Sequence, residues 1–190
     1  MESTDELLAC MGSKGTIFPL PRERVHRDAV HHLVVRVLAF NRRGRFLVQC
    51  RSLTKESCPG AYTDSASGHV SFRLQLLFNR QEVLREEAIR ELGEEVGLSV
   101  IDREGPLIKP FHKPLYSPGA RETSHCYVAA VQGKLRPSNE VDPSKTGFVG
   151  RLRLERMLEQ EDFVPVAKEL WKALLQHLGR RDPLETLFPV

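Results

Sequence analysis

The feature that most restricts the fold is residues 82–97 (EVLREEAIRELGEEVG), in which two stripes of side chains repeat at helical spacing. An α-helix brings residues three and four positions apart onto one face. Gly97 fits the left-handed position that commonly ends a helix. The segment therefore predicts an amphipathic helix packed against the rest of the fold. Its apolar stripe consists of Ala88, Ile89, Leu92 and Val96.

The second stripe of this helix is acidic. It consists of Glu87, Glu91, Glu94 and Glu95. Like charges four residues apart destabilise a bare helix, so this crowding is typical of a helix whose carboxylates hold divalent cations. Mg²⁺ prefers such hard oxygen ligands. The simpler interpretation is a solvated acidic face, and the spacing alone leaves both open.

Apolar segments on both sides of this helix predict a sheet. Residues 33–40 (LVVRVLAF) and 45–51 (RFLVQCR) flank a polar turn at 41–44 and form a predicted hairpin. Further strands are expected at 98–101, 124–131 and 148–154. Residues 164–178 predict a closing amphipathic helix with Trp171 in the core.

This order of elements predicts an α+β chain with helices on both sides of a sheet. The folded domain is expected to cover residues 29–180. Residues 1–28 contain Pro19 and Pro21 and have no clear period, so they are interpreted as an N-terminal arm with at most one edge strand. Residues 181–190 are interpreted as a C-terminal tail.

The composition is that of an ordinary soluble globular protein, with 41% hydrophobic and 28% charged residues. A net charge of +3 spread along the chain argues against a nucleic-acid partner. Every apolar run is shorter than the ~18 residues that a membrane span needs. The acidic residues at 1–8 exclude a secretory signal, and the four cysteines lack metal-binding spacing, which favours reduced thiols and a cytoplasmic location.

Glu82, seven further residues and Arg90-Glu91-Leu92-Gly93-Glu94-Glu95-Val96-Gly97-Leu98 form a longer motif. It resembles the second half of the Nudix box, E-x7-R-E-U-x-E-E-x-G-U, in which U is aliphatic. The resemblance implies a Nudix fold, which is an α/β/α sandwich around a mixed sheet with a catalytic loop-helix-loop. It also implies hydrolysis of a diphosphate linkage in a small nucleotide-like or other organic molecule.

The resemblance assigns roles to particular residues. Glu91, Glu94 and Glu95 would bind Mg²⁺, with Mn²⁺ as the alternative metal. A bound ion would activate water for attack on phosphorus, and Glu95, Glu94 or Glu140 would accept the proton. Arg90 would orient a carboxylate and Glu82 would support the cluster. Nudix domains often dimerise, so a homodimer is also expected.

One departure from the motif concerns its first half. The box should begin with a glycine six positions before Glu82, where the sequence has Leu76. The suitable glycine is Gly68, followed by His69, which leaves about eight extra residues within 72–81. This insertion at 72–80 would extend the helix backward, cover the site as a lid, or disable the site.

Residues 32–70 resemble one branch of the superfamily, isopentenyl-diphosphate isomerase. This similarity implies that Arg51 and Lys55 hold the diphosphate and that His32 and His69 match metal-binding histidines.

Two residues weaken the isomerase interpretation. Ser67 stands where the isomerase has its reactive cysteine, and Glu122 is out of register with the isomerase's paired glutamates. Three hypotheses therefore remain. The first is a Mg²⁺-dependent hydrolase, the second is an isomerase-like enzyme, and the third is an inactive Nudix domain that binds a ligand or partner.

Overall fold

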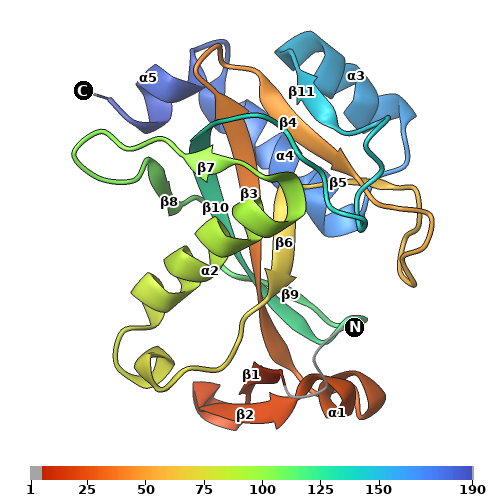
Figure 1. Ribbon diagram of the computed structural model, residues 1–190, viewed down its shortest axis with the longest axis vertical. Helices are drawn as coiled ribbons and strands as arrows, with labels where there is room; N and C mark the ends of the chain where they lie inside the picture. The colour runs from red at the N-terminus through yellow and green to blue at the C-terminus, as the bar shows by residue number, and fades with distance from the viewer. Residues whose placement is uncertain (1–5, 190) are drawn as a thin grey trace.

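The computed structural model describes residues 6–189, so residues 1–5 of the expected arm and Val190 of the expected tail lie outside the described residues. A mixed sheet runs through the middle of the molecule (Figure 1). Its central pair is parallel, with Glu122 of β10 (Glu122–Gln132) opposite His32 of β3 (His32–Asn41) and Val131 opposite Asn41. The main path of the sheet runs in the order β11 (Gly147–Val149), β4 (Phe46–Cys50), β3, β1 (Leu7–Met11) and β2 (Ile17–Pro21).

Shorter strands complete the sheet. Two of them, β5 (Tyr62–Thr63) and β6 (Ala66–His69), pair antiparallel with β4 and β3. The other three pair antiparallel with β10 (Glu122–Gln132), and they are β7 (Ser99–Val100), β8 (Ile108–Pro110) and β9 (Leu115–Ser117).

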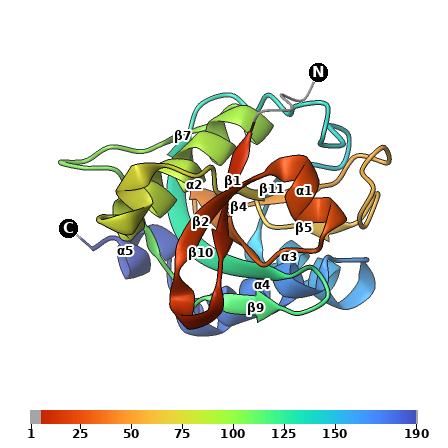
Figure 2. The ribbon, with the colours of Figure 1, turned by 90° about the horizontal axis from the view of Figure 1, so that it is seen from below.

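Helices lie on both sides of this sheet, as Figure 2 shows. Alternate residues of β3 point to opposite faces, so Val35 and Val37 pack with α2 (Arg80–Val96). Leu38 and Phe40 pack on the other face with α4 (Pro165–Leu178). The predicted α+β fold with an α/β/α sandwich around a mixed sheet is confirmed. The remaining helices are α1 (Arg22–Arg27), α3 (Arg151–Gln160), α5 (Pro183–Leu187) and the 3₁₀ turns η1 (Ser13–Gly15) and η2 (Leu74–Leu77).

The predicted hairpin and the two amphipathic helices are confirmed. The side chain of Asn41 accepts hydrogen bonds from the backbone N–H groups of Arg43 and Arg45, and Gly44 takes a φ of 67° to close the turn. Gly97 ends α2 with a φ of 70°, a conformation that glycine adopts without steric cost.

The strand predicted at 148–154 is wrong over most of its length. Residues 147–149 form β11, but α3 begins directly afterward at Arg151. The opening Arg-Leu-Arg-Leu alternates as a strand would, whereas Leu154, Met157 and Leu158 are buried at helical spacing. The segment forms a helix because the helix buries these three apolar side chains together, which removes more apolar surface from water than a strand would.

Candidate functional site

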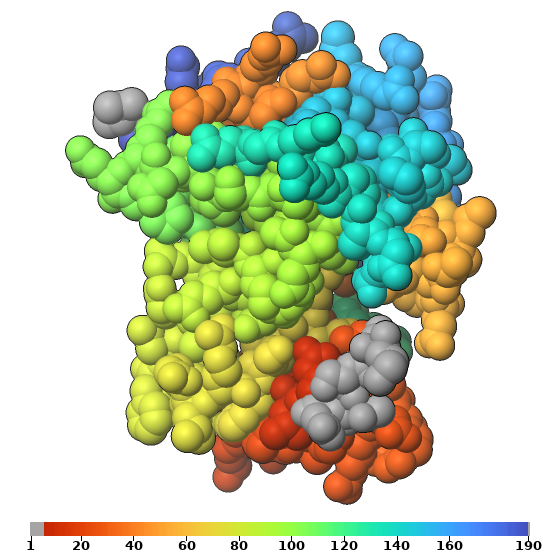
Figure 3. All heavy atoms as spheres, viewed as in Figure 1, coloured from red at the N-terminus to blue at the C-terminus, as the bar shows by residue number. Residues whose placement is uncertain are grey.

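A cavity of about 910 Å³ opens beside the C-terminal half of α2. Figure 3 shows a hollow on this face between the orange segment at 51–60 and the red segment of the N-terminal strands. The cavity walls come from α2, β3, β6, the loop after β4, the β9–β10 turn and the start of α4. Segments that are far apart in the sequence therefore line one cavity, and its volume is typical of a small-molecule binding site.

The acidic stripe of α2 reaches this cavity. Arg90, Glu91, Glu94 and Glu95 all line it, together with Gly68 of β6. Gly68 lies so close to α2 that an added Cβ would overlap the Glu91 carboxylate. The glycine therefore lets the acidic helix approach the sheet and lets Glu91 face the cavity.

Among these carboxylates, that of Glu95 is fixed by two hydrogen bonds from outside α2. Its Oε2 accepts hydrogen bonds from the backbone N–H of Ser67 at 2.9 Å and from Nε2 of Gln49 at 3.0 Å. Burial raises the pKa of Glu95 to about 8, and burial together with Glu94 and Glu87 raises the pKa of Glu91 to about 7. Such crowding suits a divalent cation, because a cation would stabilise the charged carboxylates that burial disfavours.

The arginine of the motif connects several carboxylates. Arg90 donates to Glu87 at 2.7 Å and also contacts Glu91 and Glu94, which fixes the spacing of the acidic stripe. Glu87 is buried and takes a second ion pair from Arg73 of the insertion. Glu87 belongs to the acidic stripe predicted from the sequence, although the Nudix motif assigned it no role.

Glu82 does not join this cluster. It lies in the first turn of α2, pairs with Arg85 and is absent from the cavity wall. The structure therefore separates Glu82 from Glu91, Glu94 and Glu95. Any support that Glu82 gives to the cluster would be indirect.

The predicted diphosphate-binding residues line the same cavity as α2. Lys55 Nζ forms an ion pair with Glu140 Oε2 at 2.7 Å. Arg51 donates from Nε to the backbone carbonyl of Ser57 at 2.9 Å. Arg51, Lys55 and Glu140 all line the cavity, so the structure brings two cations to the same cavity as the acidic helix.

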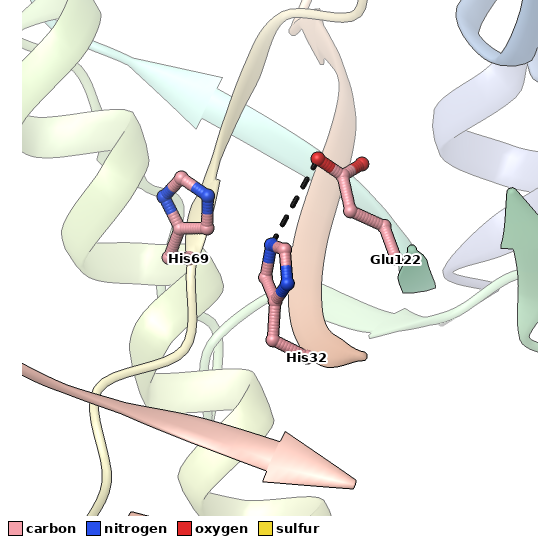
Figure 4. A group of neighbouring side chains, drawn as sticks. All are labelled: His32, His69 and Glu122. Atoms are coloured by element: carbon pink, nitrogen blue, oxygen red, sulfur yellow. Dashed lines mark ion pairs between the residues drawn. The ribbon is translucent and has the colours of Figure 1, made fainter. Parts of the chain in front are cut away.

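A second cluster contains His32, His69 and Glu122 (Figure 4), of which His69 and Glu122 line the cavity wall. Their ligand-type atoms all lie within 4.8 Å of one another. His32 Nδ1 bonds to the carbonyl of Val30 at 2.8 Å, which leaves Nε2 directed at Glu122 Oε1, 4.0 Å away. Among residues 6–189, this buried Nε2 has no hydrogen-bond partner. An orphaned imidazole nitrogen beside a carboxylate fits a metal ion.

Two residues at this second cluster, Glu122 within it and His26 beside it, were not assigned a role from the sequence. Glu122 appeared out of register, but the parallel pairing of β10 with β3 places it directly opposite His32. His26 of α1 was not considered, and its ring centroid lies 4.9 Å from that of His69. Burial lowers the pKa of His69 to about 2, which keeps its imidazole neutral and able to bind a metal.

The fold and the site define an α+β protein in which one acidic helix and one histidine–carboxylate cluster face a common cavity. A family model described as the NUDIX domain matches residues 30–170. The chain belongs to the NUDIX family, as its motif predicted.

The chain is also similar to curated proteins. It is 32% identical over 106 residues to an isopentenyl-diphosphate Delta-isomerase of Saccharopolyspora erythraea, covering 56% of this chain and 50% of the relative. A Streptomyces coelicolor protein of the same name is 29% identical over 134 residues, covering 70% of this chain and 64% of that protein. Nudix hydrolase 3 of Arabidopsis thaliana is 40% identical over 81 residues, covering 42% of this chain and 10% of that protein. The chain thus spans about half to two thirds of the isomerase relatives.

Solved structures show the same fold. A NUDIX hydrolase from Nitrosomonas europaea superposes with a TM-score of 0.55 at 16% identity, covering 92% of this chain and 89% of that one. A MutT protein from Methanosarcina mazei Go1 superposes with a TM-score of 0.52 at 21% identity, covering 74% of this chain and 89% of that one. Among the described helices, none is long and apolar enough to cross a membrane.

Proposed function

We propose that this protein is a metal-dependent hydrolase that cleaves a diphosphate linkage in a small organic molecule. One observation carries the proposal: the carboxylates of Glu91, Glu94 and Glu95 line the same cavity as Arg51 and Lys55. Acidic groups that suit a divalent cation thereby share a cavity with cations that suit a phosphate. The relatives named Nudix hydrolase support the same reaction class.

The residues take the following roles in this proposal. Glu91, Glu94 and Glu95 would hold Mg²⁺, with Mn²⁺ as the alternative, and the bound ion would neutralise diphosphate oxygens and lower the pKa of water. Glu95 serves best as the general base, because burial brings its pKa to about 8, near neutral pH. Glu94 is more exposed and paired with Arg90, and Glu140 is paired with Lys55.

Binding of the diphosphate would use the cations of the cavity wall. Lys55 would exchange its partner Glu140 for a phosphate oxygen, and Arg51 would add a second charge. Glu140 lies at the cavity and is released by this exchange, so it supports the site without holding the ion. Arg90 keeps Glu91 and Glu94 in place.

We also infer that His32, His69 and Glu122 hold a divalent cation of their own, because their ligand atoms converge and one of them is orphaned. This cluster and the relatives named isopentenyl-diphosphate Delta-isomerase favour a second candidate function, isomerisation of an isoprenyl diphosphate. Ser67 opposes it, because a serine hydroxyl is a far weaker acid than the thiol of cysteine.

The third hypothesis, an inactive binding domain, rested on the insertion. Residues 72–81 form η2 and the start of α2, and none of them lines the cavity. The insertion contacts the acidic stripe through Arg73 and Glu87 but leaves the cavity wall at Glu91, Glu94 and Glu95 open, which supports the hydrolase.

The proposal is tested by offering a panel of organic diphosphates with Mg²⁺ and following the phosphate-containing products. Glu95→Gln removes the base and a ligand, so kcat/KM should fall by about 10²–10⁴-fold. Glu94→Gln should cause a smaller loss. Glu82→Gln is the matched control on the same helix, because Glu82 lies away from the cavity, and it should leave the rate unchanged. A fully active Glu94→Gln/Glu95→Gln double variant would disprove the mechanism.

The isomerase candidate needs its own test. Isopentenyl diphosphate in D₂O would be followed by NMR for deuterium incorporation, with the wild-type protein and with Ser67→Cys. We expect no incorporation by the wild type. Incorporation by the wild type at an enzymatic rate would show that the reaction proceeds without the thiol and would favour the isomerase.

Two further expectations stand as proposals. Cys10, Cys50, Cys58 and Cys126 are free thiols, which is consistent with a cytoplasmic, reducing location. A homodimer is also proposed, and sedimentation velocity would measure the molecular mass in solution.

A further inference from the structure

A buried arginine, Arg36, lies in the middle of β3 on the cavity wall. Its residue exposure is 7%, and its partner Asp64, on the segment between β5 and β6, has an exposure of 0%. Removing a guanidinium and a carboxylate from water costs several kcal/mol per ion. A buried pair of this kind at the edge of a polar cavity therefore needs an explanation beyond stability.

The three nitrogens of this guanidinium reach three side chains on two segments, Asp64 between β5 and β6 and two residues of β10. Nη1 donates to Asp64 Oδ2 at 2.7 Å, Nε donates to Ser124 Oγ at 3.0 Å, and Nη2 donates to Glu122 Oε2 at 3.4 Å. Asp64 and Ser124 hold the planar group, and the third arm extends to Glu122. The fork geometry of arginine permits this arrangement, and lysine cannot reproduce it.

Glu122 is therefore held between two kinds of partner. Its Oε2 faces Arg36, while its Oε1 faces Nε2 of His32 at 4.0 Å (Figure 4). One oxygen is used for positioning and the other is presented to the cluster of His32, His69 and Glu122. Carboxylates that bind metals are commonly fixed in this way by an outer hydrogen-bond donor.

We propose that Arg36 is a positioning residue that orients Glu122 as the anionic ligand of a divalent cation held with His32 and His69. Asp64 balances the charge of Arg36, so the guanidinium can approach Glu122 without leaving a net buried charge. The inference rests on the metal centre proposed above and is independent of diphosphate hydrolysis.

Co²⁺ titration of the whole protein, followed by visible absorption, tests this proposal. His69→Ala identifies the absorption that belongs to the histidine-containing centre. The double variant Arg36→Gln/Asp64→Asn removes both charges and leaves neither buried ion unpaired. It should weaken Co²⁺ binding at this centre about 10–100-fold. Arg45→Gln is the control, because that exposed guanidinium only contacts the carbonyl of Phe148.

Circular dichroism would establish that each variant is folded. If the double variant does not fold, Arg36→Lys decides, because it keeps the charge beside Asp64 but loses the arm to Glu122, so Co²⁺ binding should again weaken. Wild-type affinity in the folded variant overturns the proposal. A Co²⁺ titration that is the same in His69→Ala as in the wild type overturns both the centre and the role of Arg36. A protein that binds Co²⁺ as described but hydrolyses no diphosphate disproves the hydrolase alone.

Discussion

Glu95 occupies a place in the folded protein that favours its protonated form. Its pKa rises to about 8 from an ordinary value of 4.5 because of burial, and that of Glu91 rises to about 7. The folded state thus holds protons that the unfolded chain has already lost above about pH 5. His69 has the opposite effect, since its lowered pKa reduces stability only as the pH falls below 6.5. Above pH 6.5, Glu91 and Glu95 therefore determine whether the stability rises or falls with pH.

We therefore predict that the metal-free protein loses stability between about pH 6.5 and 8.5. The decrease in the free energy of unfolding should be on the order of a few kcal/mol. Urea unfolding in EDTA at several pH values measures it. Glu95→Gln cannot ionise and should flatten the dependence, and an unchanged slope in that variant would contradict the assignment.

Gly68 provides a second prediction at the residue scale. Gly68→Ala should displace the Glu91 carboxylate, because the new Cβ would overlap it. We expect a loss of roughly 1–3 kcal/mol in stability and weaker Mg²⁺ binding, measured by thermal unfolding and calorimetric titration. Gly93→Ala is the matched control on α2, where an added Cβ meets open space, and it should stabilise by roughly 0.5–1 kcal/mol. Equal Mg²⁺ affinity in Gly68→Ala and the wild type would show that Gly68 does not position Glu91.

At the scale of single elements, local patterns predicted α2, α4 and the β3–β4 hairpin because each repeats over several turns or alternations. The carboxylates of α2 could be named for the same reason, whereas Arg51 and Lys55 were named from the resemblance to isopentenyl-diphosphate isomerase. Glu122 could not, since its position depends on the parallel pairing of β10 with β3. Arg36 lies within an apolar strand, so no local pattern distinguished it. Its partners Asp64 and Ser124 lie 28 and 88 residues away in sequence.

The structure places the insertion at residues 72–80 away from the cavity. It forms η2 at the N-terminal end of α2, and Phe78 there is 89% exposed. Phe78→Ser should change the free energy of unfolding by about 0.5 kcal/mol or less and leave kcat/KM unchanged. Steady-state kinetics on a substrate from the diphosphate panel would measure this. A large rise in KM would show instead that the segment contacts the substrate.

For the whole molecule, the two helical layers meet the sheet through large buried side chains. Trp171 of α4 is fully buried, packs edge-on against Phe46 and donates from Nε1 to the carbonyl of Thr63 at 3.1 Å. The prediction that Trp171 is a core residue is confirmed. Thr63 precedes Asp64, so this hydrogen bond links the outer helix to the cavity wall.

Trp171→Phe should therefore destabilise the whole fold. The lost hydrogen bond and the smaller ring predict a decrease of roughly 2–4 kcal/mol, measured by urea unfolding. Metal affinity should change little once the protein is folded, because Trp171 contacts no cavity carboxylate. Leu152→Ala is the control, since Leu152 is exposed on α3. Similar losses in both variants would contradict the role of Trp171.

The division of the chain at residue 28 stays a prediction, although the described part of the arm is more ordered than its sequence suggested. Leu7–Met11 pairs with Ile17–Pro21 and with β3. Short strands containing prolines carry a weak local signal. Their position follows from partners that the local sequence does not reveal.

The N-terminal segment also contributes directly to the cavity. Glu6 pairs with Arg22 at 3.1 Å and accepts a hydrogen bond from Ser71, and Glu6 and Arg22 both line the wall. A chain shortened to begin at residue 29 would keep every glutamate of α2 but would leave His69 open to water on the side that α1 now covers. Trimming this protein for crystallisation would therefore remove one side of the cavity, including the two charged residues Glu6 and Arg22.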